Sequence, residues 1–142
     1  MQTTLFFIGG LIIWSFTEYF LHRFLGHEKN WSKVFKKEHF NHHKNNDQFT
    51  KVTHKIILAL TVGVIFFGAS FTFLPLYSAI GMSIGFVFGY AFYEGVHQGI
   101  HSKSKLVPKK LQVHHMEHHK KYPMANYGVI TDKWDLVFRT KR

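Results

Sequence analysis

The chain has 142 residues and a mass of 16.7 kDa, enough for one domain. It contains no cysteine, which excludes disulfides, zinc–thiolate sites, iron–sulfur clusters and thiol nucleophiles. Lysine and arginine outnumber aspartate and glutamate by 18 to 8, and there are 12 histidines. A basic chain of this size usually suggests nucleic-acid binding, but the distribution of the charges argues against that function.

The charged residues are confined to two blocks. No charged residue precedes Glu18, and residues 56–93 contain no Asp, Glu, Lys, Arg or His. The basic residues all lie between Arg23 and Lys55 or after residue 102. One helix over this uncharged run would be too long for a hydrocarbon core of about 30 Å at about 1.5 Å per residue. We therefore expect a helical hairpin that turns at Pro75.

The predicted fold is an all-α integral membrane bundle of about three spans, with a cap of short helices outside the membrane. We expect one domain over residues 1–142, with spans at about 3–21, 56–74 and 76–100 and histidine-containing segments at 22–55 and 101–142. No basic residue precedes the first span, which argues against a cleaved signal peptide. Glycines at every fourth position, Gly81, Gly85 and Gly89, favour close helix packing in lipid.

Three spans would place both basic blocks on the same side of the membrane. The positive-inside rule predicts that this side, with the histidines and the C-terminus, is cytoplasmic. The expected location is a membrane such as the bacterial inner membrane, and the basic side suits anionic lipids or an acidic protein partner. A nucleic-acid partner is not expected, because it would not explain why apolar and basic segments are separated.

The histidines fall into four clusters, in HRFLGH, HFNHH, HQGIH and HHMEHH. Residues three or four apart share one face of a helix, and we expect short helices at 33–44, after a Ser32 N-cap, and between Pro108 and Pro123. A spacing of five, as between His22 and His27, fits a helix end or a break better than a regular helix. Convergence on shared faces gives ten candidate metal ligands: His22, His27, His39, His42, His43, His97, His101, His115, His118 and His119.

Ten imidazoles are too many for one metal ion and suit two. Neutral imidazole binds iron, copper, zinc or nickel, so hydrolysis, metal transport and dioxygen chemistry all remain open, with dioxygen chemistry fitting best. Glu18 and Glu94 precede histidines by four and three residues. Each is a candidate either to accept the free N–H of a ligating imidazole or to pair with Arg23 or a lysine. His54 is expected to be a surface residue, and His114 to contact the ligating residues at most.

These motifs, in this order, resemble the fatty acid hydroxylase (sterol desaturase) superfamily over about residues 14–140. WSFTEYFLHRFLGH resembles its first histidine motif, HFNHH its second and HHMEHH its last. YEGVHQGIH is similar to the corresponding segment of the fatty acid 2-hydroxylase branch, and NYGVITDKWDLVFRT resembles the tail that follows.

The resemblance implies a membrane-bound di-iron monooxygenase that uses dioxygen to hydroxylate a lipid acyl chain, with fatty acid 2-hydroxylation expected. It implies the same ten histidines as ligands of two iron ions, and purified relatives can hold zinc there. No catalytic residue is expected beyond the metal site. Electrons are expected from another protein, a ferredoxin or a b-type cytochrome with its reductase.

The chain departs from the family pattern at two positions beside its motifs, and three alternative functions stay open. Gly26 stands where a bulky aromatic is common, which is expected to widen the pocket, and Asn45-Asn46 follow the second motif where a proline is common. One alternative is a carotenoid hydroxylase, although its third motif tends to be one residue wider than His97–His101. The others are a sterol hydroxylase or desaturase and a metal-binding or transport protein without catalysis.

Overall fold

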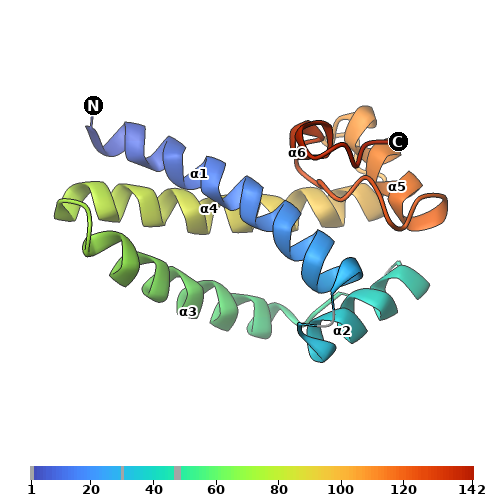
Figure 1. Cartoon of the computed structure of the whole chain (residues 1–142), viewed down its shortest axis with the longest axis horizontal. Coiled ribbons are helices and arrows are strands. Elements are labelled where there is room, and N and C mark those ends of the chain that lie inside the picture. The colour runs from blue at the N-terminus through green and yellow to red at the C-terminus, as the bar shows by residue number, and fades with distance from the viewer. Residues whose placement is uncertain (1, 30, 47–48) are drawn as a thin grey trace. The chain divides into compact units, whose positions relative to one another are not determined.

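The computed structural model describes residues 2–29, 31–46 and 49–142, and these residues form helices joined by turns and short irregular segments (Figure 1). The elements are α1 (Gln2–Phe20), the π-helix η1 (Leu21–Glu28), α2 (Lys33–Lys44), α3 (Val52–Phe71), α4 (Leu76–His101), α5 (Lys109–Lys120) and α6 (Lys133–Val137). No strand occurs in the described part of the chain, which confirms the predicted all-α fold class.

Among the described residues, three helical runs are long and apolar enough to cross a membrane, in agreement with the three predicted spans. They are Gln2–Glu28, Val52–Phe71 and Leu76–His101. The predicted hairpin is present: α3 ends at Phe71, α4 begins at Leu76, and Pro75 lies in the turn between them (Figure 1). The helix α4 continues without a break to His97 and His101, because no proline interrupts it after Leu76.

The helices form two compact units, and the first comprises Met1–Ser15 and Thr50–Phe92. In this unit, glycines let α1 and α4 approach to backbone contact. A Cβ atom on Gly85 would lie 2.1 Å from the carbonyl oxygen of Phe7, and one on Gly10 would lie 2.0 Å from that of Met82. Larger residues at these positions would force the helices apart, so small residues fix how closely they pack.

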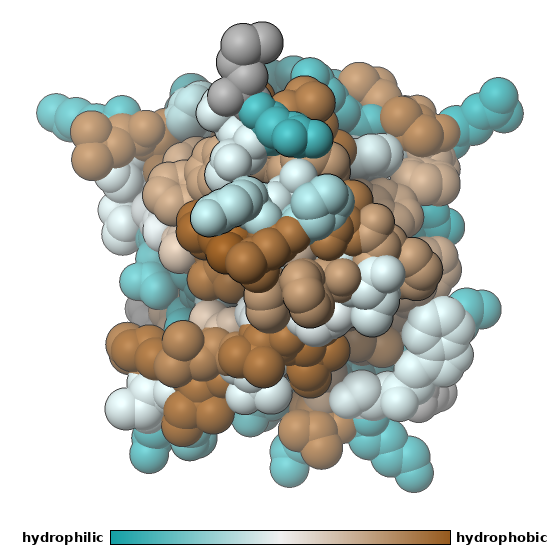
Figure 2. All heavy atoms as spheres, turned by 90° about the vertical axis from the view of Figure 1, so that its left-hand side faces the viewer, coloured by the Kyte–Doolittle hydropathy of each residue, from teal (hydrophilic) through white to brown (hydrophobic). Residues whose placement is uncertain are grey.

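The helix α3 of the first unit has no buried residue, and its apolar side chains are exposed. Val64 and Ile65, for example, are 70% and 65% exposed. Hydrophobic side chains also cover much of the face turned toward the viewer in Figure 2. Exposed apolar surface on a charge-free helix is stable in a lipid environment, which agrees with a membrane span.

The second unit comprises Phe16–Phe49 and Tyr93–Arg142 and contains all the histidines except His54. Its helix α2 begins as predicted, because the Ser32 hydroxyl accepts a hydrogen bond from the Phe35 N–H at 3.2 Å. Its helix α5 begins directly after Pro108. A small hydrophobic core of Val96, Ile100, Val107 and Val129 joins the end of α4 to the C-terminal segment.

Candidate metal centre

The π-helix η1 resolves the unusual spacing of the first two histidines. A π-helix closes its hydrogen bonds over five residues, as in the bond of 2.9 Å from the Lys29 N–H to the Phe24 carbonyl. Residues five apart are therefore neighbours on its surface, and His22 and His27 turn to the same side. The predicted helix break is a local widening of the helix that brings these two imidazoles together.

The ten candidate histidines lie in two groups of five, and the ring nitrogens of each group lie within 4.8 Å of one another. Group one consists of His22, His27, His39, His43 and His118. Group two consists of His42, His97, His101, His115 and His119. All ten belong to the second unit.

The division between the groups differs from the clusters expected from helical spacing. Pairs separated by four residues stay together, as His39 and His43 do on α2 and His115 and His119 do on α5. The remaining histidine of each helix belongs to the other group: His42 on α2 is in group two, and His118 on α5 is in group one. At 3.6 residues per turn, the residues three and four positions along a helix lie on opposite sides of the first residue. The helices α2 and α5 therefore each contribute histidines to both groups.

The Nε2 atom of His39 lies close to three other imidazole nitrogens of group one. It lies 2.8 Å from that of His27, 3.1 Å from that of His22 and 3.0 Å from that of His43. A neutral imidazole nitrogen carries either one lone pair or one N–H, so it cannot make three hydrogen bonds in three directions. A hydrogen-bonded network therefore does not account for this cluster.

Group two has the same construction. The Nε2 atom of His42 lies 3.1 Å from those of both His97 and His101. The Nε2 atom of His115 lies 3.2 Å from that of His101 and 3.0 Å from that of His119. The five ligand nitrogens of group two lie within 4.8 Å of one another.

One metal ion bound among the nitrogens of each group would explain these distances. Nitrogens at about 2.0–2.1 Å from one ion are about 2.9 Å apart at a right angle and about 3.4 Å apart at the tetrahedral angle. The Nε2 pairs above, 2.8 to 3.2 Å apart, fall close to this interval. The donor set is all imidazole, which suits iron, copper, zinc and nickel.

Hydrogen bonds fix the tautomers of two rings in group one. The Nδ1 atom of His118 donates to the carbonyl oxygen of Ala125 at 2.7 Å, and that of His22 donates to the carbonyl oxygen of Tyr127. A carbonyl oxygen can only accept, so the proton of each ring is on Nδ1 and the lone pair is on Nε2. Both rings thus turn their lone pairs toward the centre of group one.

Burial keeps the imidazoles outside the spans neutral. Burial, and next the nearby His118, lowers the pKa of His43 to about 3, and burial, and next His27, lowers the pKa of His118 to about 3. Burial and the neighbouring His97 hold the pKa of His115 well below its usual range. Neutral imidazole is the form that binds metal, so these rings are ready to ligate at neutral pH.

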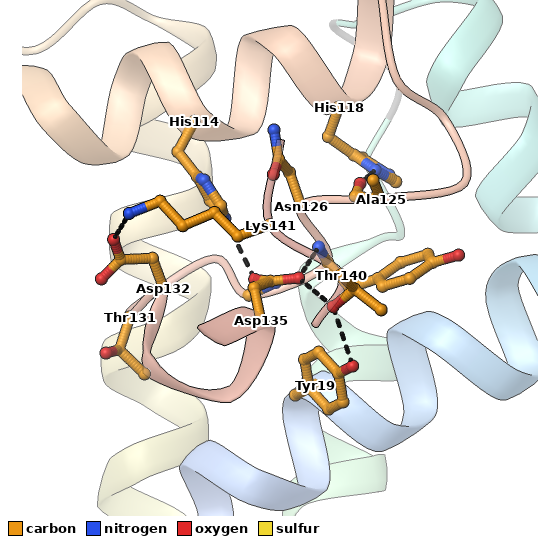
Figure 3. Close-up of polar contacts among 12 residues, drawn as sticks. Tyr19, His114, His118, Ala125, Asn126, Thr131, Asp132, Asp135, Thr140 and Lys141 are labelled. Carbon is orange, nitrogen blue, oxygen red and sulfur yellow. Dashed lines mark hydrogen bonds and ion pairs between the residues drawn. The ribbon is translucent and has the colours of Figure 1, made fainter. Parts of the chain in front are cut away.

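Asp135 on α6 is a residue of this site that the sequence patterns did not single out. It is fully buried, and its carboxylate accepts hydrogen bonds from the Tyr127 and Gly128 N–H groups, both at 2.8 Å (Figure 3). His114 reaches the same carboxylate at 3.0 Å. Burial alone would raise the pKa of Asp135, but the bonds from His114, Thr140 and the backbone lower it.

The structure gives Glu18 neither of the two roles expected from the sequence. Its Oε1 atom accepts a hydrogen bond of 3.1 Å from the Val129 N–H, and its Oε2 atom is buried. Arg23 pairs instead with Glu28 at 2.7 Å. The expectation failed because Val129, far along the chain, packs against the end of α1. Glu94 is partly buried on α4, and its role stays a prediction.

Gly26 does not widen a pocket, contrary to the expectation from the sequence. A Cβ atom at this position would lie 3.0 Å from the Cδ2 atom of His39. The imidazole of His39 occupies the space that a larger residue at 26 would need. His54, by contrast, is exposed on α3 as expected.

The fold and the site together define a class of protein: a helical integral membrane protein with two adjoining all-histidine sites that could each hold a metal ion. A family model described as fatty acid hydroxylase matches residues 7–140. The chain belongs to the fatty acid hydroxylase family.

A similar sequence and a similar solved structure agree with this assignment. The chain is 36% identical to the ceramide very long chain fatty acid hydroxylase SCS7 of Saccharomyces cerevisiae over 143 residues, which cover 94% of this chain and 37% of that protein. Its structure is similar to that of full-length Scs7p, in which only the hydroxylase domain is visible, with a TM-score of 0.78 and 34% identity over 99% of this chain and 56% of that one. The chain thus spans about a third to a half of the length of the proteins it matches.

Proposed function

We propose that this chain hydroxylates a lipid acyl chain, most simply at carbon 2 of a fatty acid, with dioxygen as co-substrate. The observation that carries the proposal is the pair of five-histidine groups in a member of the fatty acid hydroxylase family. The reaction takes R–H, dioxygen, two electrons and two protons to R–OH and water. One oxygen atom enters the C–H bond and the other leaves as water.

Both groups of histidines are proposed to hold iron, one ion in each. The ligands would be the ten residues already named, with Nε2 as the ligand atom in the pairs described above. Two bound iron ions supply the redox chemistry that dioxygen activation needs. Zinc binds the same donors, so purified protein that contains zinc would agree with this assignment.

The protein's own residues prepare the site. Carbonyl groups of Ala125 and Tyr127 hold the rings of His118 and His22 in the ligating tautomer. Complete burial of His115 and His118 excludes water from the walls between the groups. A dry, neutral wall protects reactive oxygen species from side reactions with water and protons.

The position of the histidines along the helices supports reaction near the carboxyl end of the acyl chain. His22 and His27 lie at the end of the first apolar run, and His97 and His101 lie in the last turns of α4. These are the depths at which a lipid's first carbons follow its polar head. Carbons deep in the bilayer would be farther from the metals.

The topology and the partners are also proposals. The basic blocks favour a cytoplasmic location for the second unit, in a membrane such as the bacterial inner membrane, with residues 1–142 acting as one hydroxylase domain. Exposed lysines suit an acidic ferredoxin or a small b-type cytochrome, fed by its reductase, as electron donor. The lipid substrate would enter from the bilayer.

Expression of the chain in cells under ¹⁸O₂, followed by mass spectrometry of their lipids, tests the proposal. We expect 2-hydroxy fatty acids that carry one ¹⁸O atom, lost in His115→Ala and retained in the surface variant His54→Ala. A labelled sterol or carotenoid, or an unsaturated product without label, would show that the substrate or reaction is wrong. Changed cellular metal content without any product would indicate transport instead.

A further inference from the structure

A single short turn, Ala125–Tyr127, orients two imidazoles of group one. The Ala125 carbonyl accepts from His118, and the Tyr127 carbonyl accepts from His22. His22 and His118 come from η1 and α5, and their Nε2 atoms lie 3.0 Å apart. The position of this turn therefore sets where two of the five nitrogens point.

The backbone of the turn has an uncommon shape. Asn126 has a φ of 57°, in the left-handed region that asparagine tolerates better than most residues. Its N–H donates to the Thr140 carbonyl at 2.9 Å, and its Oδ1 atom accepts from the Arg142 N–H at 2.7 Å. Residues near the C-terminus thus hold this turn, together with a hydrogen bond of 2.9 Å from the Ala125 N–H to the Tyr122 carbonyl.

The carboxylate of Asp135 is the centre of this attachment (Figure 3). One oxygen accepts from the Tyr127 N–H at 2.8 Å and from the Thr140 hydroxyl at 2.7 Å. The other accepts from the Gly128 N–H at 2.8 Å and from His114 at 3.0 Å. Four donors thus bond to one buried carboxylate. Two of them are the backbone N–H groups of Tyr127 and Gly128, in and directly after the turn.

The Thr140 hydroxyl extends the network to the first helix. It has one proton, which it donates to Asp135, so the Tyr19 hydroxyl, 3.0 Å away, must donate to it. The Arg23 guanidinium in turn donates to Tyr19 at 3.0 Å. Asp135 therefore ties the turn both to α5, through His114, and to the helix that carries His22.

The two groups of histidines differ in the hydrogen bonds that their Nδ1 atoms make. The Nδ1 atoms of His115 and His119, in group two, are buried and have no hydrogen-bond partner among the described residues. No hydrogen bond joins Asp135 or the Ala125–Tyr127 turn to either ring among the described residues. A change at Asp135 should therefore act on one group and leave the other.

We propose that Asp135 is a positioning residue for group one, and that it acts by holding the Ala125–Tyr127 turn against His22 and His118. The inference rests on the proposed function, in which group one holds a metal ion. Partners that orient ligating histidines typically contribute about 10- to 100-fold to metal affinity. Loss of the Asp135 carboxylate should weaken one of the two metal sites by this factor.

Asp135→Asn tests the proposal, because the amide NH2 is a donor and replaces one of the two oxygens that accept from the backbone N–H groups. Asp132→Asn is the matched control: it makes the same chemical change three residues away, where Asp132 pairs with Lys110 and Lys141 at 2.8 and 2.6 Å. The purified full chain of each variant is loaded with zinc alone and titrated with a chelator. Zinc release and helix content are then measured.

We expect the unsubstituted chain and Asp132→Asn to release two zinc ions in the same two steps. In Asp135→Asn, one step should move to about 10- to 100-fold lower chelator concentration while the other step and the helix content stay unchanged. Equal shifts of both steps would mean a purely structural role and would overturn the inference, as would two unshifted steps. An unsubstituted chain that binds no zinc at either group would refute the proposed function instead.

A second variant, Thr140→Val, tests the same inference if Asp135→Asn does not fold. Thr140→Val removes one of the four donors and leaves the carboxylate in place. It should shift the same single release step in the same direction by a smaller factor. If Thr140→Val shifts neither step, or shifts both equally, the inference is wrong.

Discussion

The ring of His43, in group one, stacks on the ring of His119, in group two, with centroids 4.1 Å apart and planes 7° apart. The two groups of histidines therefore share a wall. Metal ions bound in the two groups would therefore lie on either side of one wall of stacked imidazoles. His43 comes from α2 and His119 from α5, so the wall also joins these two helices.

Removal of His39 should empty one metal site and leave the other. Its Nε2 atom contacts three other nitrogens of group one, so no neighbour can replace it. We expect His39→Ala to contain about one metal ion per chain rather than two by elemental analysis, with hydroxylated product reduced at least about 100-fold. His54→Ala, on the exposed face of α3, should keep both ions and full activity.

Acid should destabilise the protein and release its metal. The pKa values of His43 and His118 are about 3 in the folded chain, against about 6.5 for histidine in an unfolded chain. Between these values the unfolded chain binds more protons, so stability is complete above about pH 6.5 and falls as the pH decreases toward 3. Thermal unfolding of the metal-free protein in detergent should show a lower midpoint at pH 5 than at pH 7.5, and metal occupancy unchanged at pH 4 would contradict histidine ligation.

Substitution of Gly26 should disturb His39 specifically. In Gly26→Ala the new methyl group would lie 3.0 Å from the imidazole ring, so the ring must shift by a few tenths of an ångström. We expect weaker metal binding in group one, detected by competition with a chelator, at a cost of about 1–3 kcal/mol. Gly95→Ala is the control, because a Cβ atom there meets nothing within 4 Å. Equal binding by both variants would show that the ring adapts freely.

Substitution of Gly85 should weaken the packing of the first unit. The added methyl group of Gly85→Ala would lie 2.1 Å from the Phe7 carbonyl oxygen, and a helix backbone cannot yield as a flexible side chain can. We expect a loss of about 1–3 kcal/mol or more in the free energy of unfolding in detergent. Gly68→Ala meets nothing within 4 Å and should be neutral or slightly stabilising, because alanine favours helix more than glycine does.

Local features of the fold followed closely from local sequence. The bounds of α2, Lys33–Lys44, and its Ser32 cap match the prediction because a capping hydroxyl and its acceptor geometry depend only on adjacent residues. The spans followed from the uncharged runs, which need no knowledge of packing. The exact bounds of the hairpin differ by a few residues, since the turn at 72–75 is longer than Pro75 alone requires.

The contacts of individual side chains did not follow from spacing. Glu18 bonds to the Val129 N–H, 111 positions away, and no periodicity could reveal that partner. Asp135 stands in a tail that resembles the family, yet it has neither a histidine's ligand chemistry nor a regular spacing from one. Its role comes from four donors that meet only when the C-terminal segment folds back.

The sequence by itself determined the class of molecule and its chemistry: apolar runs define the spans, and ten histidines at helical spacings provide an all-nitrogen donor set. Only the tertiary structure decided how those histidines divide. His42 and His43 are adjacent in the chain and belong to different groups, as do His118 and His119. Successive residues on a helix point about 100° apart, so the partners of each ring depend on which helix faces it, and that is set by packing between distant segments.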